Sequence, residues 1–208
     1  MSYCAAVITV SDRAFAGVYE DKSGPAVAEM LKEAGYEVVY TAIVPDEKEK
    51  ISEELISCAD ERHCDLIITT GGLGPTKDDI TKHTLARMFG MALVRDEAVY
   101  EQVRRMTELR HIDFNELNQA QALVPEGCVV LPNRCGTAPG MWFERDGRVL
   151  VSLPGVPFEM KALVDEQMLP RLCEHFRFRA IVHRTAITFG MAESILAETI
   201  AGWESALP

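Results

Sequence analysis

The chain has 208 residues, 48% hydrophobic and 25% charged, a balance typical of one soluble globular domain with a sizeable core. No apolar run is long enough to cross a bilayer, and the first residues lack a signal-peptide pattern. A net charge of −11 argues against a nucleic-acid partner but leaves room for a small phosphorylated ligand. The six cysteines form no C-x-x-C pair, which disfavours a zinc site and favours free thiols. We therefore expect a cytoplasmic protein with no nucleic-acid or membrane partner.

The first half of the chain alternates short apolar runs with amphipathic segments. Strands are predicted over 3–10, 36–44 and 65–70 from their β-branched, apolar composition. Helices are predicted to begin at Ser23, at Asp46 (with Glu49 completing a capping box) and at Asp79 or Thr81, the first stopping at Gly35 and the last at Gly90. This alternation predicts an α/β fold whose parallel sheet has helices on its faces and all strand carboxyl ends along one edge.

The second half predicts helices over 96–110 and 113–121, then a hairpin of strands over 141–145 and 148–153 around Asp146-Gly147. A helix over 156–168 follows, which Pro170 is expected to end. An edge strand over 176–188 and a helix over 190–203 close the sequence. We therefore expect a main domain over 1–172 and, over 173–208, the start of a second small α/β region that is truncated here.

The stretch "TTGGLGPTKDDIT" follows the third strand directly, so it lies at the edge where open α/β sheets bind ligands. Its glycines, Gly71, Gly72 and Gly74, allow close backbone approach and positive φ, and converging amides favour an anion. Asp78 and Asp79 would repel a phosphate unless a cation lay between them, which a hydrated Mg²⁺ or another divalent cation satisfies. The alternative is a plain helix N-cap preceded by turn glycines.

Other loops are predicted to reach the same edge. Asp46 follows the second strand and either faces the crevice or only caps its helix. The Ser23 and Gly24 amides form a possible anion site, unless Ser23 is a plain N-cap. Pro154-Gly155 follows the last strand and serves either ligand contact or turn packing. The sequence contains no G-x-G-x-x-G, P-loop or G-x-S-x-G motif, so three common enzyme classes lack their residues.

These motifs resemble a known family. "TTGGLGPTKDDIT", with "VPDE" upstream and "SLPGVPFEMK" downstream, is similar over residues 3–172 to the MoaB/Mog domain of molybdenum-cofactor biosynthesis. The start, "VITVSDRAFAGVYEDKSGP", resembles stand-alone molybdopterin adenylyltransferases. Later segments resemble CinA-type proteins, namely "DEAVYEQV", "NQAQALVPEG", "GTAPGMW" and "FGMAESILAETIAGWE".

The resemblance implies a three-layer α/β/α sandwich with a mostly parallel sheet and a β-hairpin addition. It implies metal and catalytic roles for Asp46 and Asp79. It assigns contacts with a phosphorylated pterin or nucleotide to Ser23, Gly24, Gly71, Gly72, Gly74, Thr76, Pro154 and Gly155. To these predicted binding residues we add Asp78, from its place in the glycine loop. The implied activity is molybdopterin adenylyl transfer, with ADP-ribose hydrolysis or a non-catalytic pterin- or nucleotide-binding assembly domain as alternatives. The exposed ends of the late elements predict a homo-oligomer.

Overall fold

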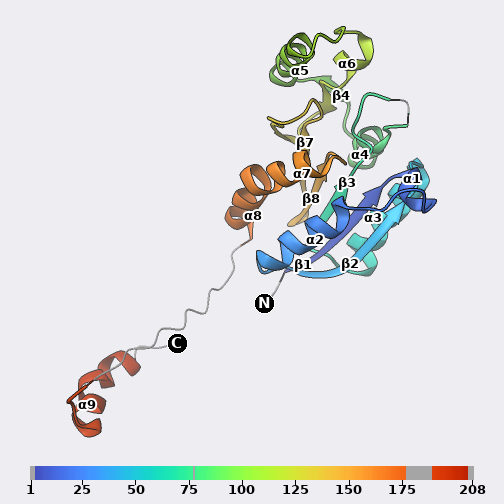
Figure 1. Cartoon of the computed structure of the whole chain (residues 1–208). Helices are drawn as coiled ribbons and strands as arrows, with labels where there is room; N and C mark the ends of the chain where they lie inside the picture. The colour runs from blue at the N-terminus through green and yellow to red at the C-terminus, as the bar shows by residue number, and fades with distance from the viewer. Residues whose placement is uncertain (1–2, 77, 177–188, 206–208) are drawn as a thin grey trace. The chain divides into compact units, whose positions relative to one another are not determined.

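The computed structural model describes residues 3–76, 78–176 and 189–205. The chain divides into two units, Met1–Phe178 and Arg179–Pro208 (Figure 1). In the second unit the described part contains the helix α9 (Glu193–Glu204), which begins three residues after the predicted start at 190 and ends one residue beyond the predicted end at 203. The strand expected over 176–188 lies, beyond Phe176, outside the described residues. None of the helices in the described ranges is both long and apolar enough to cross a membrane.

A six-stranded sheet forms the centre of the first unit. Its order is β2 (Glu37–Val44), β1 (Cys4–Val10), β3 (Leu66–Thr70), β8 (Arg148–Leu153), β7 (Gly140–Arg145) and β6 (Val129–Leu131). The first four strands pair in parallel, β7 is antiparallel to β8, and β6 is antiparallel to β7. Asp146 and Gly147 have φ of 53° and 77°, as a tight two-residue hairpin turn requires. The predicted mostly parallel sheet with an added hairpin is confirmed.

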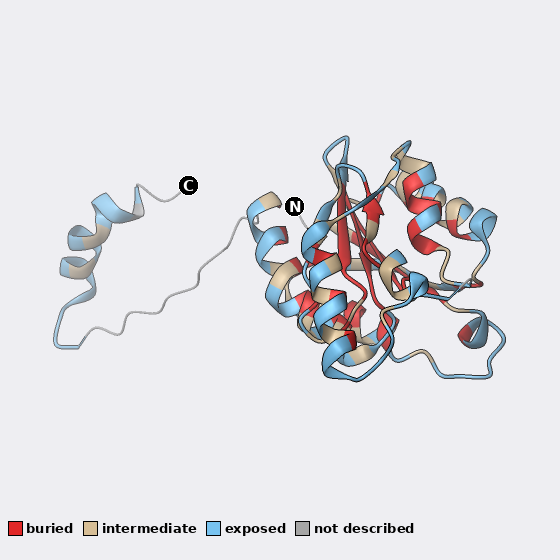
Figure 2. Cartoon of the chain, turned by 90° about the horizontal axis from the view of Figure 1, so that it is seen from above, coloured by how far each residue is buried: buried red, intermediate tan, exposed pale blue. Residues whose placement is uncertain are grey.

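Helices cover both faces of this sheet, and Figure 2 shows the buried strands between them. On one face, α2 (Ser23–Glu33), α7 (Pro157–Leu163) and α8 (Leu169–His175) pack apolar side chains such as Val27 and Leu163 against the strands. On the other face, α3 (Lys48–Ile56) and α4 (Thr81–Phe89) contribute Ile51 and Leu85. The result is the expected three-layer α/β/α sandwich.

The predicted capping box at Asp46 is wrong. The helix α3 has Glu47 at its N-cap, without a side-chain hydrogen bond, and continues into a π-helical turn, η1 (Ser57–Glu61). The Asp46 carboxylate instead accepts a hydrogen bond from the Asp12 amide across the carboxyl edge of the sheet. A competing tertiary partner has therefore taken the side chain away from its local role.

The prediction that Pro170 ends its helix is also wrong. After α7 the helix widens into a π-helical turn, η2 (Val164–Met168), and resumes as α8 with Pro170 in its first turn. A first-turn position needs no amide donor, so proline is tolerated there. The α-helical hydrogen bonding thus begins again after the π-helical turn, and Leu172 of α8 lies in the core.

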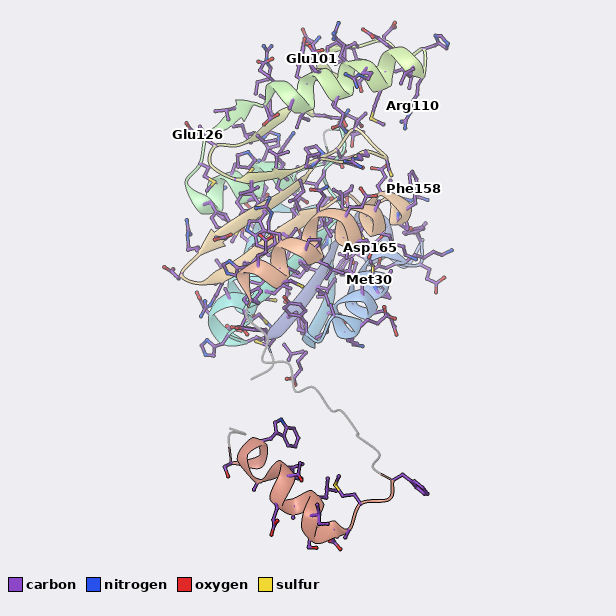
Figure 3. All side chains as sticks on the ribbon, turned by 90° about the vertical axis from the view of Figure 1, so that its left-hand side faces the viewer. Met30, Glu101, Arg110, Glu126, Phe158 and Asp165 are labelled. Carbon is purple, nitrogen blue, oxygen red and sulfur yellow. The ribbon has the colours of Figure 1, made fainter. Side chains whose placement is uncertain are left out.

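A small subdomain rises from one end of the sheet (Figure 1). It consists of β4 (Leu93–Arg95), α5 (Glu97–Leu109), α6 (Glu116–Ala120) and β5 (Leu123–Pro125). The strands β4 and β5 pair antiparallel, and Val99, Val103 and Ala122 form a separate small core. Figure 3 shows α5, which carries Glu101 and is followed by Arg110, and Glu126 where the chain leaves β5. The two helices were predicted; the three-residue strands are too short to show a sequence period.

Candidate functional site

A cleft of about 500 Å³ lies at the carboxyl edge of the parallel strands. Its walls come from the loops after β1, β2, β3 and β8, together with the α1 turn (Asp12–Phe15) and the end of α6. This volume lies in the range usual for sites that bind small molecules. The structure brings these predicted site residues into the lining and leaves Gly24 outside it: Ser23, Asp46, Gly71, Gly72, Gly74, Thr76, Asp78, Asp79, Pro154 and Gly155.

The glycine loop after β3 needs its first two glycines. Gly71 has a φ of 100°, and a Cβ there would lie 2.3 Å from the Val10 carbonyl oxygen. Gly72 has a φ of 64°, and a Cβ there would lie 2.1 Å from Thr81 Oγ1. The positive φ expected of this loop is therefore confirmed at both positions, and any side chain would meet a neighbouring element.

Three consecutive amides in this loop remain without a partner among the described residues. The Gly71 amide donates to the Leu153 carbonyl (2.9 Å) and the Thr76 amide donates to Asp79. Between them, the amides of Gly72, Leu73 and Gly74 have no acceptor in the described ranges. All three residues line the cleft. Consecutive amides without acceptors are the kind of donor group that binds oxyanions in proteins.

Thr76 holds Asp79 in place. The Thr76 amide and hydroxyl both donate to Asp79 Oδ2, at 2.9 Å and 2.5 Å. A Cβ on Gly74 would lie 2.6 Å from the same oxygen, so the third glycine makes room for the carboxylate. The polar groups of Thr76 are therefore engaged with Asp79 rather than open to a phosphate, which differs from the role that the sequence predicted.

Asp46 reaches the cleft from the loop after β2. Its Oδ2 accepts from the Asp12 amide (2.9 Å), and its own amide donates to Asp12 Oδ1 (2.8 Å). Burial, and after it the nearby carboxylates of Asp12, Asp79 and Asp78, raise the pKa of Asp46, although the hydrogen bond from the Asp12 amide opposes this. Neighbouring carboxylates repel one another when all are ionised, and a bound cation would relieve that repulsion.

This donor set fits a hydrated divalent cation shared with a phosphate, but it does not form a cage. No group of three or more His, Cys, Asp or Glu side chains in the described part of the chain is arranged to hold a metal. The second oxygens of Asp46 and Asp79 accept no hydrogen bond from described residues. Mg²⁺ commonly takes one or two carboxylates and completes its shell with water and phosphate oxygens, which is what this arrangement allows.

The amides at the start of α2 are already satisfied, against the expectation of an anion site there. Asp21 Oδ1 accepts from the amides of Ser23 (2.9 Å) and Gly24 (3.1 Å), while Asp21 Oδ2 accepts from Thr9 Oγ1 (2.6 Å). Asp21, and not Ser23, therefore supplies the capping side chain of this helix. The Ser23 hydroxyl donates to the Gly155 carbonyl (2.8 Å) and fastens α2 to the loop after β8.

The Pro154-Gly155 turn packs directly on the glycine loop. Thr70 Oγ1 donates to the Pro154 carbonyl (3.2 Å). A Cβ on Gly155 would lie 3.2 Å from the Cα of Gly71, which leaves little room for a larger residue. The turn therefore has a packing role in addition to its place in the cleft lining.

Several lining residues were not predicted as site residues. Arg13 and Tyr19 follow β1, and the Arg13 guanidinium carbon lies 5.9 Å from the Tyr19 ring centroid. Their position after a strand at the same edge was a usable signal. Gln121, Thr137 and Glu159 come from a helix end, a loop and a first helical turn. They lie within the segments that carry the family resemblance, but no role was assigned to them there.

Asn133 organises the loop that carries Thr137. It is 1% exposed, donates from Nδ2 to the Ala138 carbonyl and to Glu159 Oε2 (both 2.8 Å), and accepts from two loop amides. A Cβ on Gly136 would collide with the Glu159 carboxylate. The loop and Glu159 are thus fixed together at the cleft.

Known proteins resemble this chain over most of its length. Residues 6–174 match the family model described as "Probable molybdopterin binding domain". Curated relatives include a CinA-like protein of Flavobacterium psychrophilum, 40% identical over 98% of this chain, and one of Cytophaga hutchinsonii, 41% identical over 98%. The chain spans about half the length of these relatives, 49% and 48%.

Solved structures show the same fold. The crystal structure of the protein CinA from Thermoplasma acidophilum is 29% identical and covers 80% of this chain and 96% of its own, with a TM-score of 0.71. The tungsten cofactor synthesizing protein MoaB from Pyrococcus furiosus is 28% identical and covers 84% and 94%, with a TM-score of 0.55. With a family model matched over most of its length and a fold shared with both CinA and MoaB, the chain belongs to the MoaB/Mog-like family of molybdopterin-binding domains.

Proposed function

We propose that the cleft binds a phosphorylated pterin or adenine nucleotide and, with a divalent cation, supports chemistry at a nucleotide phosphoanhydride, as in molybdopterin adenylyl transfer. The single observation that carries this proposal is the run of unpaired amides at Gly72, Leu73 and Gly74 beside the carboxylates of Asp46 and Asp79. Amides suit phosphate oxygens, and carboxylates beside a phosphate call for a cation between them.

In this reaction a phosphate oxygen of the pterin attacks the α-phosphorus of ATP and pyrophosphate leaves. The glycine-loop amides would hold the phosphate oxygens and stabilise the negative charge that grows on them in the transition state. Asp79, fixed by Thr76, and Asp46, fixed by the Asp12 amide, would hold the cation. A bound divalent cation would offset phosphate charge and orient the reacting groups.

A second candidate is hydrolysis of ADP-ribose to AMP and ribose phosphate, with water attacking phosphorus. The observation in its favour is that the cleft extends to both sides of the glycine loop. Arg13 and Tyr19 follow β1 on one side of β3, and Glu159 follows β8 on the other. A diphosphate seated on the loop would thus have lining residues for a group at each end.

The test is a set of turnover assays on the purified chain. We expect Mg²⁺-dependent pyrophosphate release from ATP plus molybdopterin; AMP and ribose phosphate from ADP-ribose would instead favour the second candidate. Nucleotide binding without turnover under any divalent cation would indicate a non-catalytic binding domain. Failure of both ATP and ADP-ribose to bind, with or without Mg²⁺, would overturn the proposal.

Asp79→Asn provides the matching site variant. An asparagine oxygen can still accept from Thr76, so the fold should persist while one charge for the cation is lost. We expect turnover to fall by roughly 10²-fold or more, with an unchanged melting temperature. Asp60→Asn is the control, because Asp60 is exposed and pairs with Arg148 (3.5 Å) outside the cleft lining. Equal activity in the two variants would remove Asp79 from the mechanism.

A further inference from the structure

Gln121 holds an unused hydrogen-bond acceptor at the cleft. The residue is 2% exposed and lines the cleft, and its Oε1 has no hydrogen-bond partner among the described residues. Among the described residues that line the cleft, no other has a buried side-chain nitrogen or oxygen without a hydrogen-bond partner. Buried acceptors are nearly always paired, so an unpaired one at a ligand site indicates a partner that arrives with the ligand.

The neighbouring side chains fix which end of the Gln121 amide is the oxygen. Asn118 Nδ2 donates to the Asp113 carbonyl (2.8 Å), and because a carbonyl only accepts, Asn118 must present its oxygen at the other end. That oxygen accepts from Gln121 Nε2 (3.2 Å). The remaining end of the Gln121 amide is therefore the acceptor Oε1, with its orientation set by the chain itself.

The backbone around Gln121 is held on both sides. Ala122 is 0% exposed in the small core with Val99 and Val103. The Ala120 carbonyl accepts from Lys82 Nζ (2.9 Å), which ties the end of α6 to α4, the helix that follows the Asp79 loop. Gln121 therefore stands on a fixed backbone and not on a free loop.

A second acceptor lines the same cleft. Glu159 Oε2 accepts from Asn133 Nδ2, and Oε1 of the same carboxylate has no donor among the described residues. Unpaired acceptors recognise N–H and O–H groups and discriminate against ligand parts that carry only acceptors. Phosphates carry only acceptors at neutral pH, so these side chains are suited to another part of the ligand.

We propose that Gln121 is a specificity-determining residue, whose Oε1 accepts a hydrogen bond from an amine, ring N–H or hydroxyl group attached to the phosphates of the ligand. This inference rests on the proposed function, because it assumes that the cleft binds a phosphorylated ligand. The donor can belong to a sugar or to a purine or pterin ring, which share this chemistry.

The test is Gln121→Met, which keeps the length of the side chain and removes the acceptor. Calorimetry with Mg²⁺ compares inorganic pyrophosphate, which has no donor group beyond its phosphates, with ADP, ADP-ribose and a pterin diphosphate. We expect Kd to rise roughly tenfold for at least one donor-bearing ligand while Kd for pyrophosphate stays within about twofold. The ligand affected identifies the source of the donor.

Two further readouts separate recognition from structure. Urea unfolding without ligand should show Gln121→Met close to the wild type in stability, because the lost hydrogen bond to Asn118 opposes the gain from removing a buried unpaired acceptor. Gln119→Met, in the short helix α6 that Gln121 directly follows but outside the cleft lining, is the matched control and should leave every Kd unchanged.

The outcomes are distinct. Wild-type protein that binds none of these ligands overturns the proposed function and this inference with it. Wild-type protein that binds them, with Gln121→Met matching it for every ligand, overturns the inference alone. An equal loss of affinity for pyrophosphate and for the donor-bearing ligands also overturns it, because that pattern indicates a general distortion of the cleft.

Discussion

At the scale of single residues, Gly72 has a left-handed backbone conformation and lies so close to Thr81 that no Cβ fits between them. We expect Gly72→Ala to lower the free energy of unfolding by roughly 2–4 kcal/mol, from the strained φ of 64° and the contact with Thr81 Oγ1. Gly127→Ala is the matched control, because Gly127 has a φ of 87° and nothing within 4 Å of an added Cβ. It should cost only about 1–2 kcal/mol.

A second substitution isolates the contact at Gly72. Thr81 Oγ1 has no partner among the described residues, so removing it costs little by itself. The double variant Gly72→Ala/Thr81→Ala should therefore recover part of the stability lost in Gly72→Ala, as measured by urea unfolding. If no stability returns, the clash with Thr81 is not the cause of the loss.

Lys82 predicts a measurable pH dependence of stability. Burial lowers the pKa of Lys82 from 10.5 to about 8, although the charge of Asp79 opposes this. A folded-state pKa below the unfolded value means that the unfolded chain binds more protons between about pH 8 and 10.5. The charged amine therefore lowers stability below pH 8, and that penalty disappears as the pH rises through this window.

Lys82→Met removes the titrating group and exposes this effect. We expect the stability of the wild type relative to Lys82→Met to increase by about 2–3 kcal/mol between pH 7 and pH 10.5. Lys32→Met, at an exposed position of α2, is the control for the substitution itself. Denaturant unfolding at several pH values measures both. A difference that is constant with pH would mean that Lys82 keeps its ordinary pKa.

At the scale of elements, the loop between β6 and β7 depends on one buried side chain. Asn133 satisfies the Cys135 and Gly136 amides through Oδ1 and the Ala138 carbonyl and Glu159 through Nδ2. Asn133→Ala leaves these groups without their partner and should lower the unfolding free energy by about 2–4 kcal/mol. Asn115→Ala, which removes an exposed N-cap from α6, should cost only about 1 kcal/mol. Equal losses in urea unfolding would contradict the organising role of Asn133.

The elements also show what the sequence could and could not predict. The unbroken apolar run of β1, Gly90 at the end of α4 and the Asp146-Gly147 turn are local signals, and the structure follows each of them. Asp46 and Pro170 were misassigned, because a partner distant in sequence and a π-helical turn override local preference.

The same distinction applies to the cleft. Its glycine loop is predictable, because a strand followed by glycines and aspartates needs little more than chain order to be placed at the sheet edge. Gln121 and Glu159 enter from elements whose position depends on tertiary packing of the small subdomain and of α7. No local pattern encodes that packing, so the place of these two residues in the cleft was found only in the structure.

At the scale of the whole molecule, the core of the first unit closes at Phe176. Phe176 is 4% exposed, with its ring centroid 4.5 Å from that of Tyr3 and 5.9 Å from that of Tyr36. The described core clusters contain no residue beyond it. The division between units after Phe178 therefore predicts that residues 1–178 fold without the remainder of the chain.

Two truncations test this division. A chain of residues 1–178 should unfold cooperatively with the melting temperature of the full chain and bind pyrophosphate equally well. A chain of residues 1–172 loses Phe176 and should be less stable by about 3–5 kcal/mol, the usual cost of deleting a buried aromatic side chain. Phe176→Ala in the 1–178 chain should reproduce that loss, which assigns it to the aromatic contacts and not to chain length. If 1–178 is as unstable as 1–172, residues 179–208 contribute to the stability of the first unit, and the division into two independent units is wrong.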